Sequence, residues 1–167
     1  MGFSGIVVVA RADRPLTELA AIRACGGARV WAGVDGSKVA SGWQAVQISD
    51  ADDDPPPSLV TDTGAPTLVA RVVDSDFAVI QATSPAGTSW IGVLGQDQAQ
   101  RHRVPEEFLV PPEEVLDPAV AWARETGRQP DSDRLEDVLQ AEPEPTAESL
   151  VFELLGALGF DFDVPAA

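Results

Sequence analysis

Apolar residues fall in short blocks along the first half of the chain, and the blocks have the lengths of β-strands. Residues 6–10 form a continuous apolar run with three valines, which is typical of a central strand buried on both faces. Further along, the apolar runs 77–80 and 90–94 flank a Ser-Pro-Ala-Gly turn. This pattern predicts an antiparallel hairpin within residues 74–94, at the centre of the fold.

Between these apolar runs the sequence predicts two helices and, between the helices, two strands. In residues 13–26 the apolar side chains follow one stripe of a helix, which an Asp-Arg-Pro sequence begins and a Gly-Gly pair ends. Residues 29–34 and 39–48 predict two strands joined by an Asp-Gly turn. In residues 62–73 the apolar side chains recur at spacings of one, three and four, which predicts a second helix.

The resulting order is strand, helix, strand, strand, helix, strand. It matches a ferredoxin-like βαββαβ sandwich, in which two helices cover one face of an antiparallel sheet. Residues 89–94 then form an extra antiparallel strand that extends one edge. The predicted fold class is therefore α+β, with residues 1–95 as an α/β sandwich core.

After Gly95 the pattern changes to a polar stretch and then to helical spacing. Apolar residues at helical spacing predict three helices, at 113–126, 131–140 and 146–158. We expect residues 96–167 to be an acidic helical C-terminal extension that packs on the core within a single domain. The alternative is that these helices present a groove to another chain, but monomers rarely expose large apolar patches.

Acidic residues outnumber basic ones by 27 to 11, so the formal net charge is −16 at pH 7. Residues 1–100 hold 11 acids and 6 bases, a net charge of −5, whereas residues 101–167 hold 16 acids and 5 bases, a net charge of −11. Such a field repels nucleic-acid phosphates and anionic membranes, and it attracts a basic protein in a salt-dependent way. We expect neither nucleic acid nor membrane as a partner. Solubility alone is the competing explanation of the acidity.

The single cysteine, Cys25, excludes an internal disulfide. It falls at the end of a predicted helix, where the helix dipole disfavours a thiolate, so a buried and inert thiol is expected.

The apolar start of the chain lacks a basic leader and is soon interrupted by Arg11 and Asp13. We therefore expect no signal peptide and a cytoplasmic location. His102 lies between two arginines, and an exposed polar loop is the expected setting.

Few residues suggest chemistry, since no glycine-rich phosphate loop, paired-cysteine metal motif or nucleophile elbow occurs in the sequence. The triplet Asp74-Ser75-Asp76 resembles the Asp-X-Asp metal motif of nucleotide-sugar glycosyltransferases, and the resemblance covers these three residues. In that family the acids hold a divalent metal on a diphosphate. The resemblance therefore implies Asp74 and Asp76 as ligands of Mg²⁺ or Mn²⁺. The competing interpretation is a turn in which Asp and Ser side chains accept backbone amides.

Two functional hypotheses follow from the sequence. The first is a non-catalytic acidic protein-interaction module, such as an inhibitor or an immunity-like protein that recognises a basic protein and uses no cofactor. The alternative is a divalent-metal-dependent enzyme or small-ligand binder that uses Asp74 and Asp76, with Asp62 as a further ligand. The net charge and the lack of catalytic motifs favour the first hypothesis, and the sequence leaves the oligomeric state open.

Overall fold

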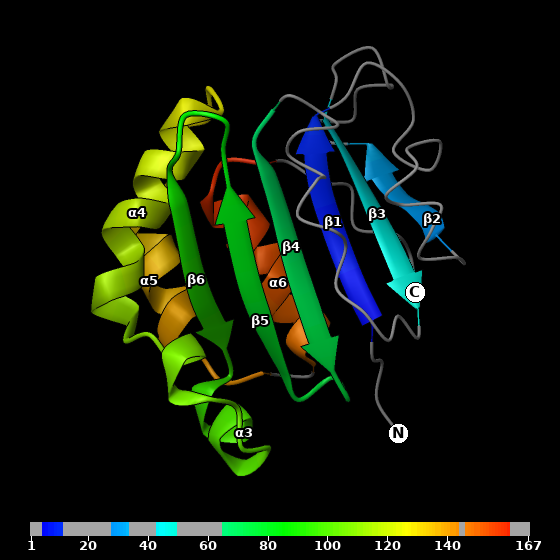
Figure 1. The fold of residues 1–167 in the computed structure, drawn as a ribbon, viewed down its shortest axis with the longest axis vertical. Coiled ribbons are helices and arrows are strands. Elements are labelled where there is room, and N and C mark those ends of the chain that lie inside the picture. The colour runs from blue at the N-terminus through cyan, green and yellow to red at the C-terminus, as the bar shows by residue number, and fades with distance from the viewer. Residues whose placement is uncertain (1–4, 12–27, 34–42, 50–64, 144–145, 161–167) are drawn as a thin grey trace.

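A computed structural model describes residues 5–11, 28–33, 43–49, 65–143 and 146–160 of the chain. These residues form an antiparallel sheet with helices packed against it (Figure 1). Cys25 and Asp62, together with the segments 12–27 and 50–64, lie outside the described residues.

The sheet has six strands, which are β1 (Gly5–Arg11), β2 (Ala28–Gly33), β3 (Trp43–Ser49), β4 (Thr67–Val73), β5 (Phe77–Thr83) and β6 (Ser89–Leu94). Their order across the sheet is β2-β3-β1-β4-β5-β6, and all neighbours are antiparallel. β1 is central, and its residues 6–10 are fully buried. That burial explains the continuous apolar run, because a strand covered on both faces needs no polar positions.

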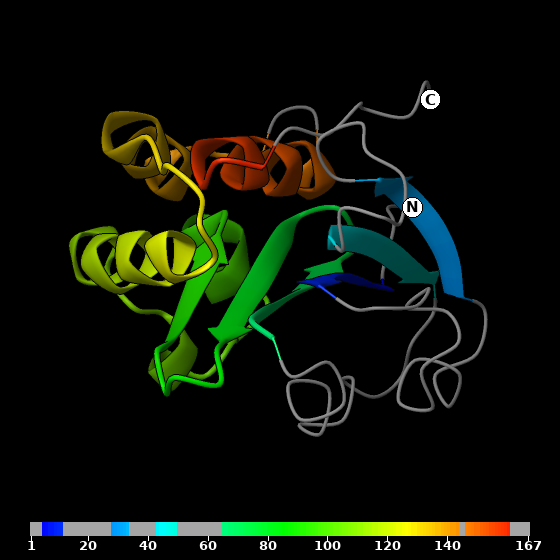
Figure 2. The same cartoon turned by 90° about the horizontal axis from the view of Figure 1, so that it is seen from above.

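The described helices are α3 (Gln96–Arg101), the short 3₁₀ helix η3 (Glu106–Phe108), α4 (Pro112–Glu125), α5 (Ser132–Gln140) and α6 (Ala147–Ala157). Figure 2 shows α5 and α6 as a layer on one side of the sheet, and α4 beside the edge strand β6. In Figure 1, α3 lies at the lower end of β5 and β6. α3 and η3 cover a part of the other side, where Ala99 and Phe108 pack against Phe77 and Val93.

These elements confirm the α+β class. β5 and β6 pair in register as an antiparallel hairpin, as the sequence pattern predicts. The hairpin lies at one edge of the sheet and not at the centre of the fold, because β1 occupies the middle of the sheet and β6 has a strand neighbour on one side. The segments that would supply the two crossover helices of a ferredoxin-like fold are 12–27 and 50–64, which the structure does not describe.

β4 corrects one prediction. The sequence predicts a helix over residues 62–73, but residues Thr67–Val73 form a strand between β1 and β5. Residues of even number in β4 lie in the core beneath the helices, and those of odd number face the opposite side. Since both faces are largely apolar, the strand shows no clean period of two, and its valines satisfy helical spacing by coincidence.

The three predicted C-terminal helices are confirmed as α4, α5 and α6. The Asp131 and Thr146 side chains cap α5 and α6 by accepting the backbone N–H three residues further on, at 3.1 and 3.4 Å. Pro118 lies inside α4 and does not delay its start. α3 is not predicted by the sequence, because it buries a single side chain, Ala99, and so leaves no apolar stripe.

The main core lies between the sheet and the helices α4, α5 and α6. At its centre Trp122 is fully buried, and its indole Nε1 donates to the carbonyl oxygen of Thr83 at 3.0 Å. The Trp122 and Phe160 ring centroids lie 6.2 Å apart, in an aromatic contact. The Arg128 guanidinium carbon lies 5.0 Å from the Phe160 centroid, which adds a cation–π contact at the end of α6.

None of the helices in the described ranges has both the length and the apolar character that crossing a bilayer requires.

Candidate functional site

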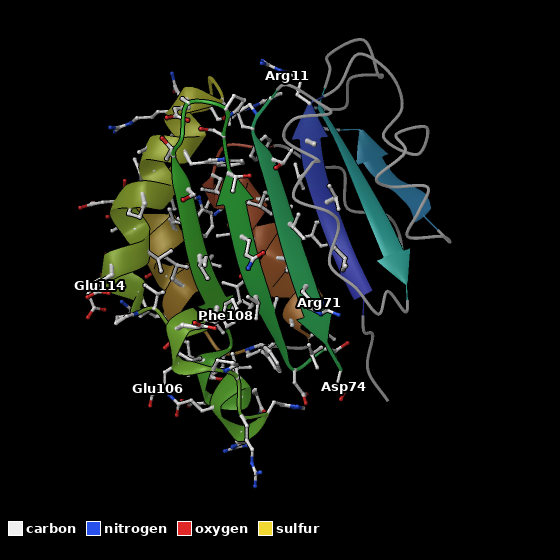
Figure 3. All side chains as sticks on the ribbon, viewed as in Figure 1. Arg11, Arg71, Asp74, Glu106, Phe108 and Glu114 are labelled. Atoms are coloured by element: carbon white, nitrogen blue, oxygen red, sulfur yellow. The ribbon has the colours of Figure 1, made fainter. Side chains whose placement is uncertain are left out.

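The side of the sheet opposite α5 and α6 carries an apolar cavity of about 220 Å³ that opens to solvent. This side of the sheet faces the viewer in Figure 3, where the lining residues Arg71 and Phe108 are labelled, and we call the cavity the front-face hollow. Among the described residues it is lined by Val69, Arg71, Val73, Phe77, Val79, Gln81, Val104, Pro105 and Phe108.

The floor of the front-face hollow consists of alternate residues of β4 and β5. Arg71 lies directly across from Val79, and Val73 from Phe77. Because successive side chains of a strand point to opposite faces, these residues share one side of the sheet. Phe77 is buried, whereas Val79 and Arg71 are half-buried. The floor is therefore a partly open apolar surface with one cation in it.

The wall of the front-face hollow is the segment that runs from α3 to η3. The Gln96 side-chain amide donates to the Val110 carbonyl oxygen at 2.9 Å, which ties the two ends of this segment together. Within it, the Phe108 amide donates to the Pro105 carbonyl oxygen at 3.0 Å. This turn holds the Phe108 ring beside the small core that Phe77 forms with Val93 and Ala99.

Carboxylates flank the front-face hollow. Glu106 and Glu107 of η3 are exposed between Pro105 and Phe108, and Asp74 is exposed just beyond Val73. Figure 3 shows Asp74 at the lower end of β4 and Glu106 at the lower left, on the α3–η3 segment. Among the described lining residues, Arg71 alone is charged. The arrangement is thus an apolar recess with one cation in its floor and acidic residues at its margin.

Asp74, Ser75 and Asp76 form the turn between β4 and β5. The Asp76 amide donates to the Val73 carbonyl oxygen at 2.9 Å, and Asp74 and Ser75 have φ values of 52° and 58°. Positive φ at both central positions is what a type I′ turn requires, and it costs a non-glycine residue roughly 1–2 kcal/mol. The Ser75 carbonyl oxygen accepts the Ala147 amide at 2.8 Å, so the turn also holds the first residue of α6.

Asp76, one of the two predicted metal ligands, contacts His102. The Asp76 Oδ2 and His102 Nε2 atoms lie 3.1 Å apart, and the imidazole centroid is 5.1 Å from that of Phe77. Within the described ranges, no three histidine, cysteine, aspartate or glutamate side chains gather where they could hold a metal ion. Mg²⁺ or Mn²⁺ binding by Asp74 and Asp76 stays a prediction, and their described role is to shape the turn.

Sequence reasoning missed the role of His102 and the whole front-face hollow. His102 is exposed as expected, but it joins the end of α3 to a turn 26 residues earlier in the chain. Arg71 gave the one usable signal, because a cation between Val69 and Val73 interrupts an apolar face. The other members of the hollow are ordinary core residue types, and only their position makes them a site.

A second acidic contact joins α3 to the connection between α5 and α6. The Glu142 side chain is exposed, but partial desolvation raises its pKa, and the neighbouring Asp97 carboxylate and its hydrogen bond with Glu142 raise that pKa further, against the opposing effect of Arg101. Two carboxylates this close repel one another when both are ionised, so the contact disfavours the ionised form of Glu142.

Glu125 makes the stability of the β5–β6 turn depend on pH. Its Oε2 accepts the Ser84 hydroxyl at 2.6 Å and its Oε1 accepts the Thr88 hydroxyl, and these bonds lower the pKa of Glu125 below its ordinary 4.5. A pKa lowered by folding stabilises the protein above the unfolded-state pKa, and this stabilisation is lost as the pH falls through the folded-state pKa.

We therefore expect Glu125→Gln to destabilise the protein most at pH values above the ordinary carboxyl pKa of 4.5, and progressively less as the pH falls through the lowered pKa of Glu125. Urea unfolding between pH 3 and pH 7 measures the difference. Asp117→Asn, at an exposed position on the same helix, is the control. A difference for Glu125→Gln that is flat across this range would contradict the assignment.

Comparison with protein-family models, with curated proteins and with solved structures finds no match for this chain.

Proposed function

We propose that this protein is a non-catalytic interaction module that recognises a basic protein. The observation that carries the proposal is the charge of the helical layer. Among the described side chains of residues 112–160, ten carboxylates are exposed and three arginines accompany them. The carboxylates are Glu113, Glu114, Asp117, Glu125, Asp131, Asp133, Glu136, Asp137, Glu142 and Glu153.

The outer face of α5 concentrates this charge. Asp133, Glu136 and Asp137 are all exposed, and residues three and four apart are neighbours on a helix surface. Like charges at this spacing repel one another by roughly 0.2–0.5 kcal/mol per pair. A basic partner would relieve that repulsion on binding and would be drawn to the surface from a distance, more strongly at low salt.

The opposite side of the sheet supports the same proposal. Protein interfaces combine an apolar, well-packed centre with a polar rim. The front-face hollow offers an apolar recess, and the exposed carboxylates Glu106, Glu107 and Asp74 lie next to lining residues in the chain. An acidic protein with such a recess is suited to holding a partner, and the described residues of the recess include no pair of groups placed for acid–base catalysis.

The proposal includes a ferredoxin-like core in a cytoplasmic protein. In a split βαβ unit another strand lies between the two strands that a crossover joins. The order β2-β3-β1-β4 supports this arrangement, because β3 separates β1 from β2 and β1 separates β3 from β4. β4 then takes the place of the fourth strand, and β5 and β6 are both additional.

The test is retention of basic proteins by the immobilised full chain at 50 and 300 mM salt, with and without the triple substitution Asp133→Asn, Glu136→Gln, Asp137→Asn. We expect one basic protein to be retained at low salt, to be lost at high salt, and to bind the variant at least tenfold more weakly when repurified. The matched control neutralises Asp52, Asp53 and Asp54, which changes the net charge by the same amount at another place.

Two results would contradict the proposal. One is that no basic protein distinguishes the wild-type chain from the α5 variant. The other is that the control variant weakens binding as much as the α5 variant does, because net charge alone would then account for retention.

A further inference from the structure

We infer that the front-face hollow receives a single aromatic side chain of the partner, carried on a segment with lysine or arginine on both sides of it. This inference rests on the proposed function and adds the place and the chemistry of recognition. It is drawn from the size of the hollow, from its lining and from the charges around it.

The size of the hollow points to one side chain. Its volume is about 220 Å³, whereas pockets for drug-sized ligands have volumes of roughly 300–1,000 Å³. Protein interfaces commonly place a large aromatic residue in a recess of this kind, where it contributes a major part of the binding energy. The hollow therefore fits an anchor residue better than a larger free ligand.

The lining favours an aromatic anchor. Val73 and Val79 of the floor and Phe108 of the wall offer apolar surface to a ring from two directions. Arg71 lies between the valines of β4, and its guanidinium is a group that stacks on aromatic faces. A ring over Arg71 would gain a cation–π contact that an aliphatic side chain could not make.

The exposed acidic residues near the hollow favour particular partner residues on both sides of the aromatic anchor. Glu106 and Glu107 are exposed next to Phe108, and Asp74 is exposed beyond Val73 at the end of β4. A segment that crosses the hollow with its ring over Arg71 would bring its neighbouring residues toward these acids. Basic neighbours are attracted there, and acidic neighbours are repelled by the margin and by the net charge of −16.

The probe is a blocked pentapeptide with one tryptophan between two pairs of lysines, added to the isotope-labelled full chain and followed by amide chemical shifts. We expect the largest shifts at Arg71, Val79 and Phe108. Replacing the tryptophan by alanine is expected to weaken binding about tenfold or more, and replacing the lysines by glutamates to abolish it.

Two substitutions form the matched pair. Val79→Gln places a polar group in the floor and is expected to weaken the peptide about tenfold. Ile91→Gln changes a half-buried residue of β6 that is not part of the lining, and it is expected to leave binding unchanged. Thermal unfolding of both variants shows whether each is folded, and if Val79→Gln unfolds the protein, Arg71→Gln replaces it.

The outcomes separate this inference from the proposed function. Shifts elsewhere, or equal binding of the alanine peptide, would overturn the inference. Equal binding of free indole would also overturn it, because the hollow would then be a small-molecule site. If binding of a basic partner requires the α5 acids but is unchanged by Val79→Gln, the inference is overturned and the proposed function still stands. Tryptophan binding at the hollow regardless of flanking charge would overturn the inference, because the inference requires basic residues on both sides of the ring.

Discussion

Replacing Trp122 with alanine is expected to lower the free energy of unfolding by about 3–5 kcal/mol, the range observed for a buried large aromatic residue. Trp122 is fully buried between α4 and the sheet, in contact with Phe160, so truncation leaves a cavity in the main core. It also removes the hydrogen bond from the indole to the Thr83 carbonyl oxygen. Domains of this size are stable by only about 5–15 kcal/mol, so the variant is expected to unfold at a much lower urea concentration.

Trp90 provides the control for the hydrogen bond. Its side chain is also buried, but its Nε1 finds no acceptor in the part of the chain that the structure describes. Trp122→Phe removes an indole N–H that donates a hydrogen bond, whereas Trp90→Phe removes a buried indole N–H that makes no hydrogen bond to the described residues. We expect the first to cost about 1 kcal/mol more than the second. Equal costs in urea unfolding would show that the bond to Thr83 does not contribute.

Gly95→Ala is expected to destabilise the protein by about 2–4 kcal/mol, through a close contact and a strained backbone together. A Cβ atom at Gly95 would lie 2.7 Å from Pro143 Cγ and 2.9 Å from the Asp76 carbonyl oxygen, and the residue has φ +78°. These neighbours come from the β4–β5 turn and from the connection after α5. The substitution therefore pushes apart three segments that meet at the start of α3.

Gly87→Ala separates the two effects. Gly87 has a similar φ of +94°, but a Cβ atom there would meet nothing within 4 Å. Only the backbone strain remains, so we expect Gly87→Ala to lower the free energy of unfolding by about 1 kcal/mol. The measurement is the difference in unfolding free energy between the two alanine variants. If they were equally destabilised, the close approach of Pro143 and Asp76 to Gly95 would be ruled out.

The parts of the fold that sequence reasoning predicted are those set by local rules. The caps Asp131 and Thr146 and the helical spacing of leucines and valines defined α5 and α6, because a helix presents one side to the core and its ends need side-chain acceptors. The β5–β6 hairpin was predictable for the same reason, since its turn lies between two apolar runs.

The helix predicted over residues 62–73 was wrong, because the local sequence pattern does not distinguish a helix from the strand β4. Its valines lie on both faces, so the apolar pattern carries no strand period, and the spacing also fits a helix. Pairing with β1 on one side and β5 on the other decides the conformation. The pairing with β1 joins residues as far apart as Gly5 and Val72, which a short window of sequence does not contain.

By itself the sequence determined the α+β class, the positions of the C-terminal helices and the strong acidity of the second half, because composition and local periodicity fix these properties. It also singled out Asp74 through Asp76, but the tertiary structure gave this segment its described role, as a strained turn held by His102 and Ala147. Only the tertiary structure produced the front-face hollow, because sheet pairing and the fold of the α3–η3 segment bring Arg71 and Phe108 to the same cavity. The local pattern shows Arg71 as an interruption of an apolar face, but it does not show which residues lie opposite.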